Sequence, residues 1–168
     1  MEAEEGTTGR REDGRNLIEE AQTELGAHYA WNQETFEAAP TDGTPILGLF
    51  ESSHMQYEAD RGDEPSLAEM TAKAIEALQA SGGENGFFLQ VESGRVDHAN
   101  HAGNAGRMVR DGRAFVEAIR VADEMTDDAN TLIVVTADHE HAIGLNGYCG
   151  RGSNILGLCA EINNEGVE

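Results

Sequence analysis

Positive charge is scarce in this sequence. Its 168 residues include 11 lysines and arginines, with Lys73 the only lysine, against 32 aspartates and glutamates. The formal net charge of −21 excludes binding to nucleic-acid phosphates as a main role and disfavours anionic membranes. The acidic residues are spread along the chain, so we expect a folded protein adapted to high salt, in which charges are screened beyond about 10 Å at 0.1 M. The alternatives are a merely acidic protein or an acidic tail.

Long hydrophobic runs are also missing, and we expect no secretory signal in this sequence. No run approaches the roughly 18 apolar residues of a membrane span, and the first residues, 1–6, are acidic and polar. The two cysteines, Cys149 and Cys159, lie in a glycine-rich stretch, and their spacing allows either a disulfide or two thiols. We predict a flexible acidic leader at residues 1–15 and one partial α/β domain at residues 16–168.

Apolar runs alternate with segments of helical periodicity. The pattern predicts helices at 16–25, 66–80 and 105–125, and buried strands at 46–50, 87–91 and 131–135. The second helix carries a capping box, in which Ser66 and Glu69 satisfy each other's backbone amides. Right-handed crossovers between such elements give an α/β fold with a parallel, doubly wound sheet.

Carboxylates and imidazoles follow two of the predicted strands. Glu92 comes directly after strand 87–91, and Asp138 and His139 follow strand 131–135. Ligands gather at the carboxyl ends of parallel strands, so these side chains should meet at one edge of the sheet. Asp97 and His101 are four residues apart, which places them on one face of a helical turn.

This donor set favours divalent metals. Imidazole with carboxylate suits zinc, and an all-oxygen site suits magnesium. Taken singly, Asp138–His139 could be an ion pair, Asp97–His101 a surface helix contact and Glu92 a solvated strand end. Together they indicate a metal site, although the five candidates cannot complete two zinc sites and a magnesium site, so further donors must lie elsewhere.

The two segments resemble those of alkaline phosphatases, most closely the animal-like branch. Val91 to His101 is similar to the family's Val-Glu-Gly-Gly-Arg-Ile-Asp-His…His segment, with Ser93 replacing a glycine, and Thr136 to His141 matches Thr-Ala-Asp-His-x-His. The likeness extends from about Asp13 to Leu158. Further matching segments are 29–32, 48–51, 55–58, 65–67, 147–152 and 155–158.

The resemblance implies a role for each candidate and a phosphomonoester as substrate, hydrolysed through a phosphoserine. Asp97 and His101 would hold a first zinc, Asp138 and His139 a second zinc, and Glu92 the magnesium. His98 would lie behind the ligands or beside the substrate. Two zinc ions would clamp the entering and leaving oxygens.

The resemblance also implies a calcium site. The animal-like enzymes hold calcium with the carbonyl of a phenylalanine, the following glutamate and a later acidic residue, matched here by Phe50, Glu51 and Glu64, where the family usually has an aspartate. Such an oxygen-rich acidic loop suits calcium in its own right. The alternative is a solvated acidic loop.

Several family features have no counterpart in the sequence. The nucleophilic serine, the metal-bridging aspartate and the phosphate-binding arginine would lie upstream, and a zinc-binding histidine downstream. We therefore expect a central fragment that is inactive alone, periplasmic or extracellular by resemblance. Its exposed sheet edges should make it a homo-oligomer. The alternatives are a non-catalytic acidic module that binds divalent metals, and a related phosphomutase or phosphodiesterase.

Overall fold

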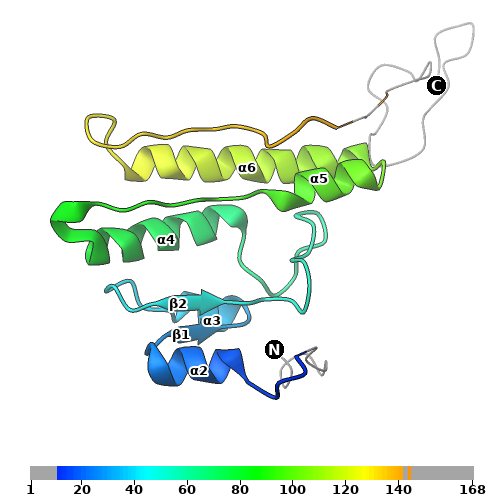
Figure 1. The fold of residues 1–168 in the computed structure, drawn as a ribbon. Coiled ribbons are helices and arrows are strands. Elements are labelled where there is room, and N and C mark those ends of the chain that lie inside the picture. Colours follow the sequence, from blue (N-terminus) through cyan, green and yellow to red (C-terminus); the bar gives the residue numbers. More distant parts are fainter. Residues whose placement is uncertain (1–10, 142–143, 145–168) are drawn as a thin grey trace, which may run out of the picture.

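A computed structural model of the chain describes residues 11–141 and residue 144. The described elements, in chain order, are α2 (Leu17–Glu24), β1 (His28–Ala30), α3 (Gln33–Glu37), β2 (Ile46–Gly48), α4 (Leu67–Gly82), the 3-10 turn η1 (Gly83–Asn85), α5 (Gly94–His101) and α6 (Ala105–Met125) (Figure 1). Cys149 and Cys159 lie outside the described residues. No helix of the described part is long and apolar enough to cross a membrane.

The three predicted helices are confirmed, and their ends follow local chemistry. Asn16 caps α2 by accepting from the amide of Glu19, and Asn104 caps α6 in the same way. The Ser66–Glu69 capping box begins α4, and Gly83, at φ +51°, ends it in a conformation that favours glycine. Of these end signals only the Ser66–Glu69 box was predicted, whereas α2 and α6 were predicted from their apolar periodicity.

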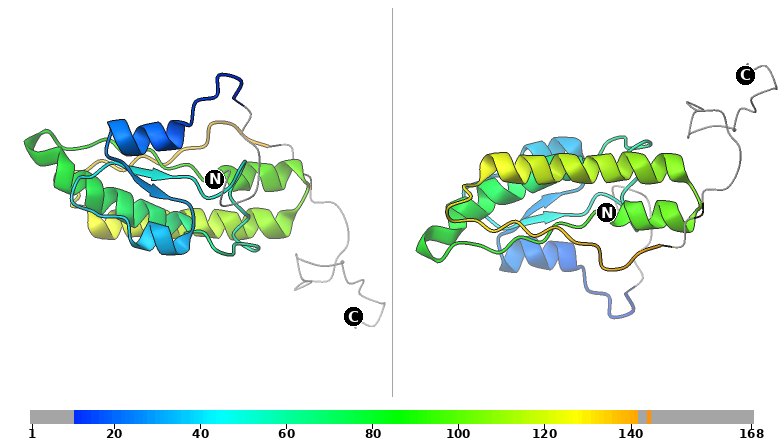
Figure 2. Two further views of the ribbon diagram at one scale, coloured as in Figure 1. Left: turned by 90° about the horizontal axis from the view of Figure 1, so that it is seen from below. Right: turned by 90° about the horizontal axis from the view of Figure 1, so that it is seen from above.

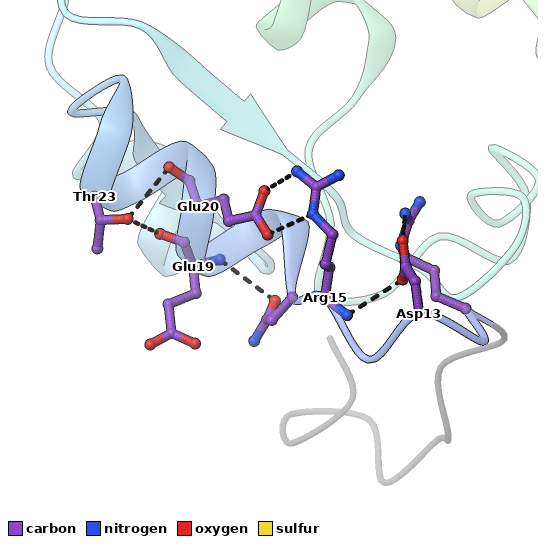
Figure 3. A network of polar contacts seen from close by, with 7 residues as sticks. Asp13, Arg15, Glu19, Glu20 and Thr23 are labelled. Atoms are coloured by element: carbon purple, nitrogen blue, oxygen red, sulfur yellow. Dashed lines mark hydrogen bonds and ion pairs between the residues drawn. The ribbon is translucent and has the colours of Figure 1, made fainter.

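The segment before α2 is tied to that helix by charged side chains (Figure 3). The guanidinium of Arg15 donates to the Glu20 carboxylate at 2.9 and 2.5 Å, and its backbone amide donates to Asp13 at 3.2 Å. These contacts are exposed and contribute little stability. Residues 1–10 lie outside the described part, so the predicted leader at 1–15 stays a prediction.

β1 and β2 pair in parallel, with His28 opposite Ile46 and Ala30 opposite Gly48. This pairing confirms a parallel α/β arrangement, although β2 is shorter than the predicted strand at 46–50. Figure 2 shows α2 on one side of the layer that contains the strands, and α4 and α6 on the other side. Helices on both sides of a parallel sheet are typical of a doubly wound fold.

The predictions of strands at 87–91 and 131–135 are wrong for the described structure. Both segments are extended and run in the same direction as the sheet (Figure 1), but neither forms a backbone hydrogen bond with another described strand. Phe88 and Leu132 are each 85% exposed and Val134 is 73% exposed. A strand is defined by its partner, and within the described residues these segments have none.

The core lies where α6 packs against α4 and α5. Ile75 of α4 and Ala118 of α6 are buried there, and Ala99 seats α5 with no exposed surface. Phe36 of α3 meets Phe50 edge to face, with ring centroids 5.9 Å apart. The packing of α5 on α6 fixes the helix that carries the first pair of predicted metal ligands.

Candidate metal centre

α5 presents Asp97 and His101 on one face. Nε2 of His101 lies 3.4 Å from Oδ2 of Asp97, as the four-residue spacing predicts. The intervening Ala99 is fully buried, so the opposite face of α5 is anchored in the core. The pair is therefore held on a helix whose orientation is fixed by packing.

The segment after 131–135 brings two further histidines to Asp97. Nε2 of His139 lies 4.0 Å, and Nε2 of His141 lies 3.8 Å, from Oδ1 of Asp97. Asp138 is next to His139, at 3.4 Å from carboxylate oxygen to Nε2, but its side chain is otherwise exposed. The structure thus gathers the predicted residues Asp97, His101, Asp138 and His139, although the last two do not follow a paired strand.

His141 was not among the predicted ligands. Asp97, His101 and His141 each offer a donor atom, and these atoms lie within 4.8 Å of one another. The rings of His101 and His141 meet edge to face at 4.6 Å. The signal for His141 was present in the sequence, as the second histidine of the Asp-His-x-His segment.

Two atoms at this cluster lack hydrogen-bond partners. Oδ1 of Asp97 and Nδ1 of His141 are buried and unpaired within the described structure. Buried polar atoms are normally satisfied, and a carboxylate oxygen surrounded by imidazole nitrogens would be satisfied by a cation. The donor atoms of Asp97, His101 and His141 lie within 4.8 Å of one another, against ~3.3 Å between donors around one tetrahedral zinc. A donor set of one carboxylate and two imidazoles is therefore of the kind that suits a divalent metal ion such as zinc.

The tautomer of His139 suits metal binding. Its Nδ1 lies 2.9 Å from the carbonyl oxygen of Glu140, which can only accept, so in the neutral ring Nδ1 carries the proton and Nε2 keeps a lone pair. The Glu140 carbonyl and the Asp138 carboxylate raise the pKa of His139 in the metal-free protein. A second-nitrogen hydrogen bond of this kind is typical of metal-binding histidines.

Glu92 and His98 lie at a neighbouring cavity of about 280 Å³ rather than in the histidine cluster. A side chain at Gly94 would place Cβ 3.2 Å from Oε1 of Glu92, so glycine leaves room for that carboxylate. His98 contacts the ring of His54 and the guanidinium of Arg95. Burial, helped by those two neighbours, lowers the pKa of His98.

The predicted calcium ligands also come together. The backbone amide of Gln56 donates to Oε1 of Glu64 at 2.7 Å, and its side-chain amide donates to Glu51 at 2.8 Å. Phe50, Glu51 and Glu64 line a second cavity of about 300 Å³. Glu64 is only 3% exposed, its Oε2 is unpaired within the described structure, and burial raises the pKa of its carboxyl.

The fold and this cluster define an α/β protein with carboxylate and histidine donors close enough together to hold a metal ion. The chain belongs to the alkaline phosphatase family, because the family model described as Alkaline phosphatase matches residues 1–168. It is 43% identical to a membrane-bound alkaline phosphatase of Bombyx mori over 95% of this chain and 30% of that protein. It is 42% identical to an alkaline phosphatase of Gadus morhua over 93% of this chain and 34% of that protein.

A solved structure agrees with these sequence relatives. The crystal structure of Thermus thermophilus alkaline phosphatase superposes with a TM-score of 0.64 at 35% identity, covering 72% of this chain and 25% of that one. The animal relatives are consistent with the predicted animal-like branch. The chain spans about a third of the length of the relatives it matches.

Proposed function

We propose that this chain contributes part of the metal centre of an alkaline phosphatase that hydrolyses phosphomonoesters. The observation that carries the proposal is the convergence of three histidines on Asp97, whose Oδ1 is buried and unpaired in the described structure. Membership of the alkaline phosphatase family supports phosphomonoester hydrolysis as the reaction to which this cluster contributes.

The residues divide by position. Asp97 and His101 would hold one zinc, with His141 beside them, and Asp138 and His139 would hold a second. Glu92, at the neighbouring cavity, would hold magnesium. Bound zinc would act as a Lewis acid on a phosphoryl oxygen and would lower the pKa of a bound water.

The chain is proposed to be inactive alone, because no residue in it matches the family's nucleophilic serine. On its own, the chain would then be an acidic module that binds divalent metals. The net charge of −21 and the unpaired Asp97 oxygen favour this second function. Relatives at about 40% identity are alkaline phosphatases, which supports this family over a phosphomutase or phosphodiesterase. A periplasmic or extracellular location is proposed on the same ground.

Zinc binding by the 168-residue chain tests this function. Isothermal titration with Zn²⁺ should give a site that Asp97→Asn weakens at least about tenfold, because an amide is a poorer ligand than a carboxylate. Asp123→Asn, an exposed aspartate of α6, is the matched control and should bind as wild type. Equal zinc affinity in all three proteins would contradict the metal centre.

Hydrolysis of p-nitrophenyl phosphate by the same samples tests inactivity. We expect no zinc-dependent release of p-nitrophenolate. Turnover that scales with the protein and disappears in Asp138→Ala would overturn the proposal that the chain lacks a nucleophile.

Calcium is proposed for the cavity of Phe50, Glu51 and Glu64. The unpaired Oε2 of the buried Glu64 supports this site, because a cation would satisfy that oxygen and would offset the burial that raises the pKa of the carboxyl. Ca²⁺ should raise the thermal midpoint of the wild type and should have a smaller effect in Glu64→Gln. Glu84→Gln changes an exposed glutamate of η1 and should respond to Ca²⁺ as the wild type does. If Glu84→Gln reduces the calcium effect as much as Glu64→Gln does, calcium acts by general screening and not at this site.

A further inference from the structure

Arg95 is held by three contacts at the beginning of α5. Its Nε donates to the carbonyl oxygen of Met55 at 2.5 Å, and its guanidinium lies 4.2 Å from the ring centroid of Tyr57. Arg107 of α6 lies over the same ring at 4.5 Å and pairs with Asp60 at 2.7 Å. The loop around Tyr57 is thus fixed to both α5 and α6, and Arg95 has little freedom to reorient.

The third contact of Arg95 is with His98. Nη1 of Arg95 lies 3.2 Å from Nδ1 of His98. A guanidinium has only donors, so Nδ1 must accept and the proton of the neutral ring must be on Nε2. His54, whose ring centroid is 4.2 Å from that of His98, packs against the same imidazole.

His98 and His139 therefore carry the proton on opposite ring nitrogens. His139 donates from Nδ1 to a carbonyl and keeps a lone pair on Nε2, as a metal ligand requires. His98 has its Nδ1 lone pair occupied by Arg95, which leaves an N–H donor at Nε2. The hydrogen bond made by the other nitrogen sets which role each histidine can take.

We infer that Arg95 is a positioning residue that holds His98 as the Nε2–H tautomer, a hydrogen-bond donor beside the metal centre rather than one of its ligands. His98 lines the 280 Å³ cavity together with Glu92, Ser93 and Arg95. An N–H at this place suits an oxygen of an oxyanion. That last step rests on the proposed phosphatase function, whereas the tautomer and the role of Arg95 do not.

The test is ¹⁵N NMR of the imidazole rings in the full 168-residue chain, with His98→Gln assigning the signals. At about pH 8, above the ordinary pKa of histidine near 6.5, the ring is neutral and the two nitrogen shifts report the tautomer. We expect an Nε2–H pattern for His98 in the wild type. Arg95→Met should move both shifts toward the average of the two tautomers, and Arg95→Lys should partly restore them.

Arg107→Met is the matched control, because Arg107 also stacks on Tyr57 but makes no contact with His98 in the described structure. It should leave the His98 shifts as in the wild type. An Nδ1–H pattern in the wild type, or identical shifts in Arg95→Met and the wild type, would overturn the inference. If Arg95→Met fails to fold, judged by its amide spectrum, an Nδ1–H pattern in the wild type still overturns the inference.

Adding Zn²⁺ separates this inference from the proposed function. His101, His139 and His141 should shift as ligands, while His98 keeps its Nε2–H pattern. If no histidine responds to zinc but the His98 tautomer stands, the proposed function fails and the role of Arg95 survives. If His98 itself shows direct zinc ligation, the inference fails.

Discussion

Asp97 is the side chain on which the candidate metal centre depends most, because imidazoles from two separate segments approach its carboxylate. Asp97 and His101 could be predicted from the sequence, since four-residue spacing on a helix is a local property. His141 was missed although it belongs to the same Asp-His-x-His segment as the predicted Asp138 and His139, because only the first two residues of that segment were predicted as ligands. The contacts of Arg95 with Met55 and Tyr57 could not be predicted, because they join α5 to a loop about forty residues earlier in the chain.

The role of His141 gives the first prediction. His141→Gln should weaken zinc binding at least about tenfold, because it removes an imidazole that shares the cluster with Asp97 and His101. Isothermal titration with Zn²⁺ measures the change. His28→Gln is the control, since His28 lies in β1 and contacts the Thr35 carbonyl. Unchanged affinity in His141→Gln would place His141 outside the metal site.

Asp111 gives a prediction about pH. It is 5% exposed, its Oδ1 accepts from the amide of Glu58 at 3.2 Å, and its Oδ2 is unpaired within the described part. Burial raises the pKa of its carboxyl, so the folded state holds this proton more tightly than the unfolded state. The free energy of unfolding should therefore fall as pH rises from the ordinary aspartate pKa through the raised one.

Asp111→Asn should remove that pH dependence. The amide keeps an oxygen for the Glu58 amide and carries no charge, so stability near pH 7 should rise by about 1 kcal/mol. The gain should shrink as pH falls toward pH 4, because the wild-type carboxyl takes up its proton on the way down through its raised pKa. Urea unfolding of the wild type and of Asp111→Asn at both pH values measures these free energies. Asp123→Asn, at an exposed aspartate of α6, is the control. Destabilisation at neutral pH would instead mean that the Asp111 charge has an ionic partner.

Helices and strands differed in how well they could be predicted. The helices α2, α4 and α6 were found because apolar periodicity, and in α4 also a capping box, is encoded within each segment. The segments 87–91 and 131–135 have the composition of buried strands, but pairing depends on residues far away in the chain. β1 was missed because His28–Ala30 is too short to show a period.

The capping box of α4 gives a prediction about helix ends. Ser66→Ala removes the acceptor of the Glu69 amide and should lower the free energy of unfolding by about 1 kcal/mol. Ser81→Ala, near the other end of α4, removes only a 3.3 Å bond to the Leu78 carbonyl and should have a smaller effect. Urea unfolding compares them. Equal losses would show that serine packing, rather than the cap, matters.

The chain combines apolar extended segments with a strongly negative charge. Leu132, Val134 and Val135 are exposed, and their segment has no strand partner among the described residues. Unpaired backbone and apolar side chains favour association through added strands. The net charge of −21 opposes it, by a repulsion that salt screens. At low salt the negative charge should therefore prevent the predicted homo-oligomer, and at high salt, to which we expect the protein to be adapted, the oligomer should form.

We therefore predict that the isolated chain self-associates more strongly as salt increases. Light scattering across a series of NaCl concentrations should show a rising mass, because screening removes repulsion while apolar burial remains favourable. Leu132→Lys with Val134→Lys should keep the chain monomeric, since two charges on the extended segment oppose pairing. Val116→Lys, at an exposed valine of α6, is the control for added charge alone and should still associate. A monomer at every salt concentration would show that the exposed segment does not bind a second copy of the chain. Loss of association in Val116→Lys would instead place the contact on α6.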